Sequence, residues 1–291
     1  MILQDWQILS LLTSFATAVY IHVNHTQKIC GLTLVLLRGL FMVVLLGSIA
    51  LFLPLPQQDW FFYFCALAIG FCVVWGDKHL LNAAAKHGGR LTSLFISMKI
   101  FLLFTVWSII EPSSFLSLLT QPWVMVGMLA CYIAMVAAML GLRRQDHTAA
   151  AVVAVVPAAV FLSGADIFTK LGLDETAGFA DMVYFLLVGQ AGCVVGSAVL
   201  LRKDLCTRYR HVFSKKHLKG TAIILVPFLA LVVTFVSAVS RAPNPAYVGA
   251  ITVLTTVWLT VYYKLTRGDS ANWQSTFVLV AAAMGLTLLT S

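Results

Sequence analysis

The stretch that decides the fold is Gly31–Leu53, which reads GLTLVLLRGLFMVVLLGSIALFL and contains one charged residue, Arg38, in 23 positions. About 20 mainly apolar residues in an α-helix are enough to cross the hydrocarbon core of a bilayer. The run is therefore predicted to be a transmembrane helix.

The composition of the whole chain gives the same indication. Of its 291 residues, 60% are hydrophobic and 10% are charged, and the mean hydropathy is +0.94. Soluble domains typically carry about a quarter charged residues. So few charges do not cover a water-exposed globule of this length, and lipid must contact much of the surface. The chain is predicted to be one all-α membrane protein.

Nine further apolar runs bring the number of predicted transmembrane helices to ten. No positive segment precedes the first run and no small-residue cleavage site follows it, so we expect a permanent span there and not a signal peptide. In chain order the ten runs are Trp6–Val23, Gly31–Leu53, Trp60–Leu81, Leu91–Ile110, Phe115–Leu140, Ala149–Leu171, Ala180–Leu201, Gly220–Ser240, Pro245–Leu265 and Trp273–Leu289.

Residues within and beside these runs are typical of membrane helices. Gly192 and Gly196 form a GxxxG pair, which permits two helices to approach closely. Aromatic residues at several boundaries fit the belt found at the level of the lipid headgroups. They are Trp6, Tyr20, Trp60, Trp123, Tyr247 and Trp273.

The six cysteines show no CxxC motif and no pairing with histidine at the spacing of metal ligands. Four of them lie inside apolar runs, where cysteine behaves as a small hydrophobic residue. Neither a disulfide framework nor a metal site is predicted, and no cofactor is expected.

Basic residues are concentrated in alternate loops. Fifteen of the 19 Lys and Arg residues lie in the odd-numbered loops or at the ends of the runs beside them. The positive-inside rule therefore places these loops in the cytoplasm and both termini outside, in a multi-pass protein of the cell (inner) membrane. Because the net charge of +8 follows from this topology, nucleic acid is not an expected partner.

The densest basic segment is Arg202–Lys219, between the seventh and eighth runs. We interpret it as a cytoplasmic loop that fixes orientation and lies near anionic lipid headgroups. A nucleotide or partner site is the alternative, but no glycine-rich phosphate loop accompanies it.

The two halves of the chain resemble each other weakly. Ser14–Tyr20 in the first run resembles Ser163–Thr169 in the sixth, and Lys86–Glu111 and Asn244–Asp269 each lead through a run to an acidic residue. Many transporters consist of two repeats with the solute bound between them. We therefore expect two five-helix repeats, residues 1–145 and 146–291. An odd number of helices per repeat makes the second inverted relative to the first.

With these features the chain resembles the drug/metabolite transporter superfamily, in its ten-helix EamA-like branch. The resemblance depends on Arg38 in the second run, on Ala83–Lys86 between the third and fourth, and on a closing turn at Gly268–Asp269 before the last helix, where the family has Gly-Glu. It implies ten helices in inverted repeats, alternating access, and export or exchange of metabolites. Family members usually keep both termini in the cytoplasm, opposite to the orientation that the charges here predict.

Charged residues inside the runs are the first candidates for function, because a charge at the depth of the bilayer is costly. Lys99 lies nine residues into the fourth run, roughly 12 Å deep. It either pairs with a carboxylate on a neighbouring helix or binds an anionic group of a solute. Arg38 either holds helices together or, if it points inward, offers its planar fork to a carboxylate or phosphate.

Asp166 is the one carboxylate well inside an apolar run. It is a possible partner of Lys99 or Arg38, and a buried carboxylate is also suited to carrying a proton in coupled transport. The alternative is a position near the outer interface, beside Lys170.

Further polar and aromatic residues are candidates for lining a cavity, although packing is the alternative for each. Trp258 and Tyr262 are four residues apart and therefore share a helix face. The other candidates are Trp75, Asp77, Gln190 and Thr255. Counting two cations against one acid, we expect a positive cavity and a solute with a carboxylate or phosphate.

The sequence thus favours a secondary transporter for a small polar, anionic metabolite: an amino acid, an organic acid or a phosphorylated compound. A flippase for a phosphorylated lipid headgroup is an alternative that the same cationic groove would suit. An intramembrane enzyme is less favoured, because the sequence has no HExxH, no Asp-rich prenyl-phosphate motif and no convincing Ser/His pair.

Overall fold

The computed structural model describes residues 4–27, 29–87, 91–113, 116, 120–141, 149–173, 177–267 and 273–289. All regular secondary structure in these ranges is helical, which confirms the all-α class. The closing turn at Gly268–Asp269 lies outside the described residues, as do Arg143 and Arg144 of a basic loop.

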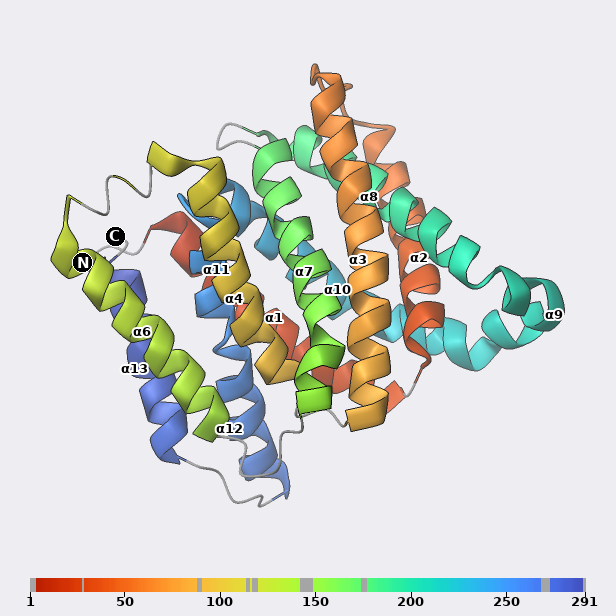
Figure 1. Cartoon of the computed structure of the whole chain (residues 1–291). Coiled ribbons are helices and arrows are strands. Elements are labelled where there is room, and N and C mark those ends of the chain that lie inside the picture. Colours follow the sequence, from red (N-terminus) through yellow and green to blue (C-terminus); the bar gives the residue numbers. More distant parts are fainter. Residues whose placement is uncertain are drawn as a thin grey trace.

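A helix covers at least part of each predicted run (Figure 1). The helices are α1 (Asp5–Gln27), α2 (Gly31–Ala50), α3 (Trp60–His87), α4 (Leu91–Ile110), α6 (Pro122–Gly141), α7 (Ala149–Gly172), α8 (Phe179–Leu200), α9 (Arg202–Val212), α10 (Lys215–Arg241), α11 (Pro245–Thr252), α12 (Thr255–Arg267) and α13 (Trp273–Leu289). By length and apolar composition, six segments of the described chain are able to cross a membrane: Asp5–Asn24, Gly31–Ala50, Trp60–Leu80, Phe179–Leu200, Lys215–Arg241 and Pro245–Thr266.

Large apolar side chains cover much of the outer surface, as expected of helices surrounded by lipid. Phe52 is 88% exposed and Trp123 84% exposed, and Trp60 is exposed as the aromatic belt predicts. The belt prediction is wrong for Trp6 and Tyr247, which are buried. Their rings lie 6.3 Å apart inside the bundle, because α1 packs against α11.

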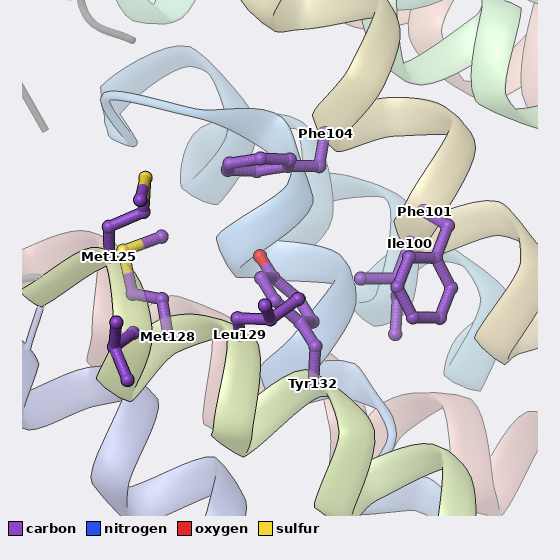
Figure 2. A pocket seen from close by; sticks show the side chains of 8 residues that line it. Ile100, Phe101, Phe104, Met125, Met128, Leu129 and Tyr132 are labelled. Carbon is purple, nitrogen blue, oxygen red and sulfur yellow. The ribbon is translucent and has the colours of Figure 1, made fainter. Parts of the chain in front are cut away.

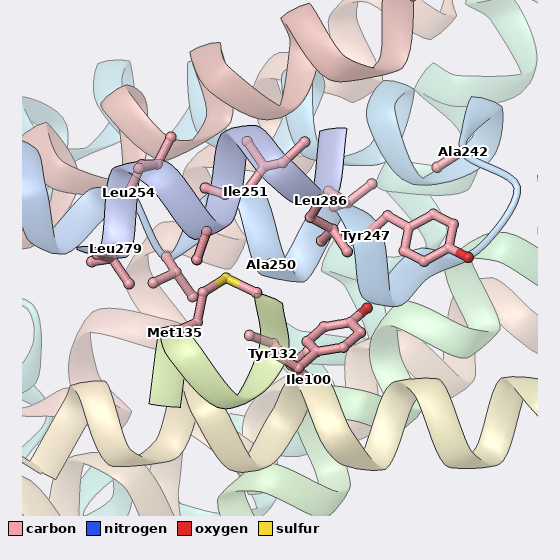
Figure 3. Packing of buried hydrophobic residues seen from close by; sticks show 14 of the residues in the cluster. Ile100, Tyr132, Met135, Ala242, Tyr247, Ala250, Ile251, Leu254, Leu279 and Leu286 are labelled. Atoms are coloured by element: carbon pink, nitrogen blue, oxygen red, sulfur yellow. The ribbon is translucent and has the colours of Figure 1, made fainter. Parts of the chain in front are cut away.

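The helices pack in pairs that join the two halves of the chain. The main contacts are those of α3 with α7 and with α8, of α1 with α10, of α2 with α8, and of α6 with α13. Figure 3 shows one buried apolar cluster, to which α4, α6, α11 and α13 contribute. A second cluster lies between α2, α3, α8 and α10. The interior of the bundle is therefore built from both halves together.

Backbone atoms of α3 and α8 approach each other closely at their glycines. A Cβ atom built on Gly70 of α3 would collide with the carbonyl oxygen of Gly189 and would lie 2.9 Å from the amide nitrogen of Cys193. A Cβ atom on Gly192 would lie 3.3 Å from the carbonyl oxygen of Leu67. The predicted role of Gly192 in close helix packing is confirmed, with Gly70 as its counterpart.

The predicted run Pro245–Leu265 lies within a segment that is long and apolar enough to cross a membrane, Pro245–Thr266, but the helix in it is interrupted. A turn at Val253 and Leu254 separates α11 from α12. Four of the five residues around it, in Ile251–Thr255, are β-branched, which lowers helix propensity. The Thr255 hydroxyl donates a hydrogen bond to the backbone oxygen of Ser14, 2.9 Å away, and so ties the break to α1.

The basic segment Arg202–Lys219 was expected to be a loop, but most of it is helical. It contains α9 and the first turn of α10, which Ser214 caps by accepting a hydrogen bond from the backbone N–H of His217. Val212 is buried beside Leu36 of α2. Apolar residues of α9 therefore anchor the segment to the bundle.

Candidate functional site

Two ion pairs lie among the apolar helices of the bundle. In the first, Lys99 Nζ of α4 lies 2.7 Å from Asp166 Oδ2 of α7. The side chain of Asp166 is 4% exposed and that of Lys99 is 18% exposed. The Ser163 hydroxyl also donates to the backbone oxygen of Lys99, at 3.4 Å. Of the two partners that the sequence allows for Asp166, the structure shows Lys99, and the pair joins two neighbouring helices from different halves of the chain.

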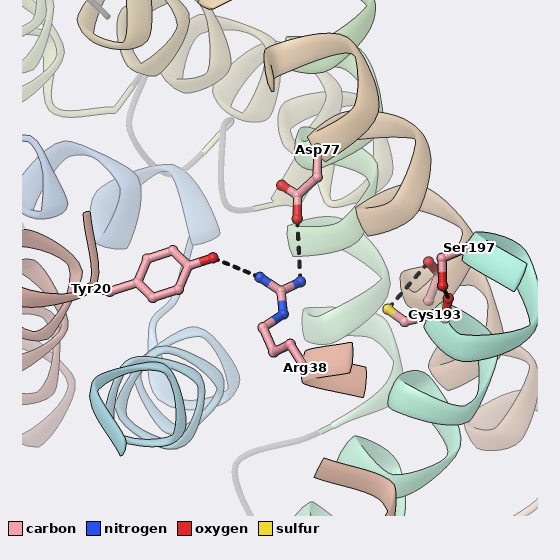
Figure 4. A network of polar contacts seen from close by, with 6 residues as sticks. Tyr20, Arg38, Asp77, Cys193 and Ser197 are labelled. Atoms are coloured by element: carbon pink, nitrogen blue, oxygen red, sulfur yellow. Dashed lines mark hydrogen bonds and ion pairs between the residues drawn. The ribbon is translucent and has the colours of Figure 1, made fainter. Parts of the chain in front are cut away.

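The second ion pair belongs to Arg38, whose side chain points into the bundle (Figure 4). Its Nη2 lies 3.2 Å from Asp77 Oδ2 of α3, and its Nη1 donates a hydrogen bond of 2.9 Å to the Tyr20 hydroxyl of α1. The guanidinium group lies 4.0 Å from the ring centroid of Phe228 on α10. Arg38 therefore connects four helices through one side chain.

The two pairs lie close enough to act on each other. The ammonium group of Lys99 interacts electrostatically with Asp77 as well as with Asp166. Lys99 Nζ also lies 5.4 Å from the ring centroid of Phe235, on the same helix as Phe228. We call this set the buried charge network. Its members are Tyr20, Arg38, Asp77, Lys99 and Asp166, with Phe228 and Phe235 against the two cations.

The formal charges of the buried charge network cancel. Arg38 and Lys99 supply two positive charges, and Asp77 and Asp166 supply two negative ones. The count behind the expected positive cavity, two cations against one acid, was therefore wrong. It left out Asp77, which the geometry makes the partner of Arg38. Pairing of this kind lowers the cost of placing charges among apolar helices.

One member of each pair is more accessible than its partner. Asp77 has a side chain 21% exposed, against 4% for Arg38, and Lys99 is 18% exposed, against 4% for Asp166. The more accessible side chains of the network are therefore one acidic residue, Asp77, and one basic residue, Lys99.

Trp258 and Tyr262 lie together on α12, as their spacing predicts, but they face α1. The indole nitrogen of Trp258 donates to the Ser14 hydroxyl at 2.9 Å, and the Tyr262 hydroxyl lies 3.3 Å from Nε2 of His22. Both aromatic side chains are partly exposed. Within the described chain, no hydrogen bond or ring contact joins either of them to Lys99 or Arg38.

The two remaining candidates occupy different places. The Trp75 ring stacks on Phe161 and on His79, with centroids 6.0 Å apart in each case, and Lys78 Nζ lies 4.4 Å from the Trp75 ring centroid. Gln190 of α8 is 7% exposed, and its Oε1 accepts no hydrogen bond from any residue that the structure describes. Trp75 thus belongs to an aromatic stack, and Gln190 has an unused buried acceptor.

Metal ligands do not gather in the described part of the chain. No group of three or more His, Cys, Asp or Glu residues there has a geometry that could hold a metal ion. The two ion pairs are groups that can exchange partners or take up and release a proton.

No protein-family model matches the sequence, and no curated protein matches it either. The buried charge network and the helices packed around it are the features of the molecule that bear on its function.

Proposed function

We propose that the protein is a secondary transporter that moves a small polar metabolite across the cell membrane by alternating access. The buried charge network is the observation that carries this proposal. Charged groups at bilayer depth are costly and mark solute and proton pathways in membrane proteins. Lys99 and Asp166, on neighbouring helices of the two halves, are the pair on which transport would depend.

The helix packing supports ten spans arranged as two inverted repeats, residues 1–145 and 146–291. In that numbering α1 and α10 are spans one and eight, and α3 and α7 are spans three and six. In a pair of five-helix repeats, span one corresponds to span six and span three to span eight. The contact of α1 with α10 therefore corresponds to the contact of α7 with α3, and both are present. The contacts of α2 with α8 and of α6 with α13 then join corresponding spans. This symmetry also supports the proposed place of the chain in the EamA-like branch of the drug/metabolite transporters.

The accessible members of the network favour one of the three solute classes. A solute carboxylate would compete with Asp166 for Lys99, and a solute amine would suit Asp77. An amino acid carries both groups, whereas organic acids and phosphorylated compounds need carry only the first. Once Lys99 has bound the solute, Asp166 is free to take up a proton, which couples transport to the proton gradient.

The basic segment Arg202–Lys219 supports the proposed orientation, with odd-numbered loops in the cytoplasm and both termini outside. Lys203 and Arg210 are exposed on α9 while Val212 is buried against the bundle. An arrangement of this kind holds cations at the level of anionic lipid headgroups.

Transport in proteoliposomes tests the proposal. The purified protein should take up at least one member of a panel of labelled amino acids, organic acids and sugar phosphates, with saturable kinetics. Lys99→Ala should reduce the rate by about tenfold or more, because it removes one charge-assisted hydrogen bond to the solute. Lys203→Ala is the matched control, since this lysine is exposed on α9, and it should transport normally.

Three results would contradict the proposal. Equal uptake by the Lys99→Ala variant would remove the role of Lys99. Translocation of a labelled phospholipid, without uptake of any solute of the panel, would indicate a flippase. Hydrolysis of an added lipid would indicate an enzyme.

A further inference from the structure

A cavity of about 230 Å³ lies between α4 and α6, apart from the buried charge network. Phe101 and Phe104 line it from α4, and Met125, Leu129 and Tyr132 line it from α6 (Figure 2). With 100° of rotation per residue, Phe101 and Phe104 project from roughly the opposite face of α4 to Lys99. The cavity therefore does not belong to the proposed transport site.

The cavity opens toward the surface that lipid would cover. Phe101 is 41% exposed and Leu129 is 54% exposed, although both also line the cavity. Almost all of the lining consists of aliphatic, aromatic or thioether groups. Such a lining suits an apolar molecule that enters from the bilayer. Methionine adapts its shape to different ligands, and aromatic walls favour a partner with rings.

One polar group interrupts this apolar lining. Tyr132 is 4% exposed, and its hydroxyl has no hydrogen-bond partner among the described residues. Figure 2 shows the hydroxyl directed between Phe104 and Met125, into the cavity. A buried hydroxyl without a partner is unfavourable. A ligand with an acceptor at this point would satisfy it.

The depth of Tyr132 restricts which ligand can supply the acceptor. The residue lies ten positions after Pro122 and nine before Gly141, so it is close to the middle of α6. Ester carbonyls of phospholipids lie about 15 Å from the centre of the bilayer, at the edge of the hydrocarbon core. A phospholipid chain would therefore fill the cavity without reaching the hydroxyl.

We propose that this cavity binds a lipophilic aromatic carbonyl compound that enters from the bilayer. The Tyr132 hydroxyl donates a hydrogen bond to the carbonyl oxygen, and Phe101 and Phe104 pack against the rings. This binding is independent of transport by the buried charge network.

Benzophenone is a suitable probe, because it consists of two apolar rings and one carbonyl group and labels nearby C–H bonds under ultraviolet light. In proteoliposomes it should label Met125 or Met128, both of which line the cavity, with saturation at low probe concentration. Mass spectrometry of the digested protein identifies the labelled residues.

Two variants distinguish the contribution of the hydrogen bond to probe binding from the contribution of the apolar space. Tyr132→Phe should weaken saturable labelling about three- to tenfold, the loss expected for one hydrogen bond. Leu129→Trp should fill the cavity and abolish labelling. Tyr184→Phe is the matched control, because the Tyr184 hydroxyl donates instead to the backbone oxygen of Ala50, and its labelling should equal that of the unaltered protein.

Diphenylmethane has the same rings without the carbonyl group, so it should compete equally with benzophenone in the unaltered protein and in Tyr132→Phe. Labelling spread over exposed apolar residues without preference for Met125 or Met128 would overturn the proposal. So would labelling that both Tyr132→Phe and Leu129→Trp leave unchanged. Labelling in detergent that disappears in lipid would show that acyl chains occupy the cavity, and would overturn it too.

Discussion

Phe228 and Phe235 lie two turns apart on the same face of α10, and each ring lies against one of the two buried cations. The guanidinium group of Arg38 is 4.0 Å from the Phe228 centroid, and Lys99 Nζ is 5.4 Å from the Phe235 centroid. The face of an aromatic ring attracts a cation. One side of α10 therefore contacts both ion pairs of the buried charge network.

The two rings should differ in what they contribute to stability. Phe228→Leu is expected to lower the free energy of unfolding by about 2 kcal/mol, through loss of a close cation–π contact and of buried ring area. Phe235→Leu should cost less than half as much, because its ring is farther from the cation and only partly buried. Denaturant unfolding of both variants in the same detergent measures the difference. Equal losses would contradict this assignment.

The pair Lys99–Asp166 should behave as a unit. Asp166→Asn leaves a mostly buried ammonium group without its counter-ion and should destabilise the fold by about 3 kcal/mol. The double variant Lys99→Met, Asp166→Leu removes both charges and should recover most of that loss. A double-mutant cycle on thermal unfolding measures the coupling, and additive effects would show that the two groups do not interact.

At Gly70 the α3–α8 contact should tolerate no added carbon atom. Gly70→Ala is expected to destabilise the protein by about 1–3 kcal/mol, since its Cβ atom meets backbone atoms of α8 that no rotamer change can move. Gly164→Ala is the control, because its Cβ atom would approach only Cys72 Sγ, at 3.4 Å. Unfolding temperatures of the two variants test this. A Gly70→Ala variant as stable as Gly164→Ala would argue against so close an approach.

The proposed orientation makes a prediction for the two exposed cysteines, Cys30 and Cys206. They follow the first and seventh predicted spans, so both belong to odd-numbered loops. A membrane-impermeant maleimide should label them only from the cytoplasmic side. The Cys30→Ser and Cys206→Ser variants assign each signal. Labelling from outside would reverse the topology and agree with the usual orientation of the family that the chain resembles.

The sequence predicts the helical class and one ion pair because the same physical constraint governs both. Apolar helices in lipid have little polar surface, so a charge such as Lys99 or Asp166 must find a partner inside the bundle. The pair of Arg38 and Asp77 could have been predicted by the same reasoning. Arg38 lies seven residues after Gly31 and Asp77 four before Leu81, at predicted helix ends on the same side of the membrane. Their depths therefore differ by only about 4–5 Å.

Other members of the network could not be recognised from the sequence. The chain has 19 Phe residues, and nothing in the sequence distinguishes Phe228 and Phe235 from the others. An apolar helix has no polar face from which its orientation in the bundle could be inferred. Tyr20 was assigned to the aromatic belt, since it lies near the end of a predicted run. Its contact with Arg38 depends on how α1 is rotated about its axis relative to α2. Packing against the neighbouring helices sets this rotation.

The backbone contact of Gly70 with α8 also limits how the bundle is able to change shape. At this contact no side chain lies between the two backbones, so no rotamer change can absorb a shift of one helix against the other. A rearrangement that keeps the contact therefore moves α3 and α8 together, and Asp77 of α3 moves with them. Where α2 does not follow, such a movement would draw the carboxylate of Asp77 away from Arg38.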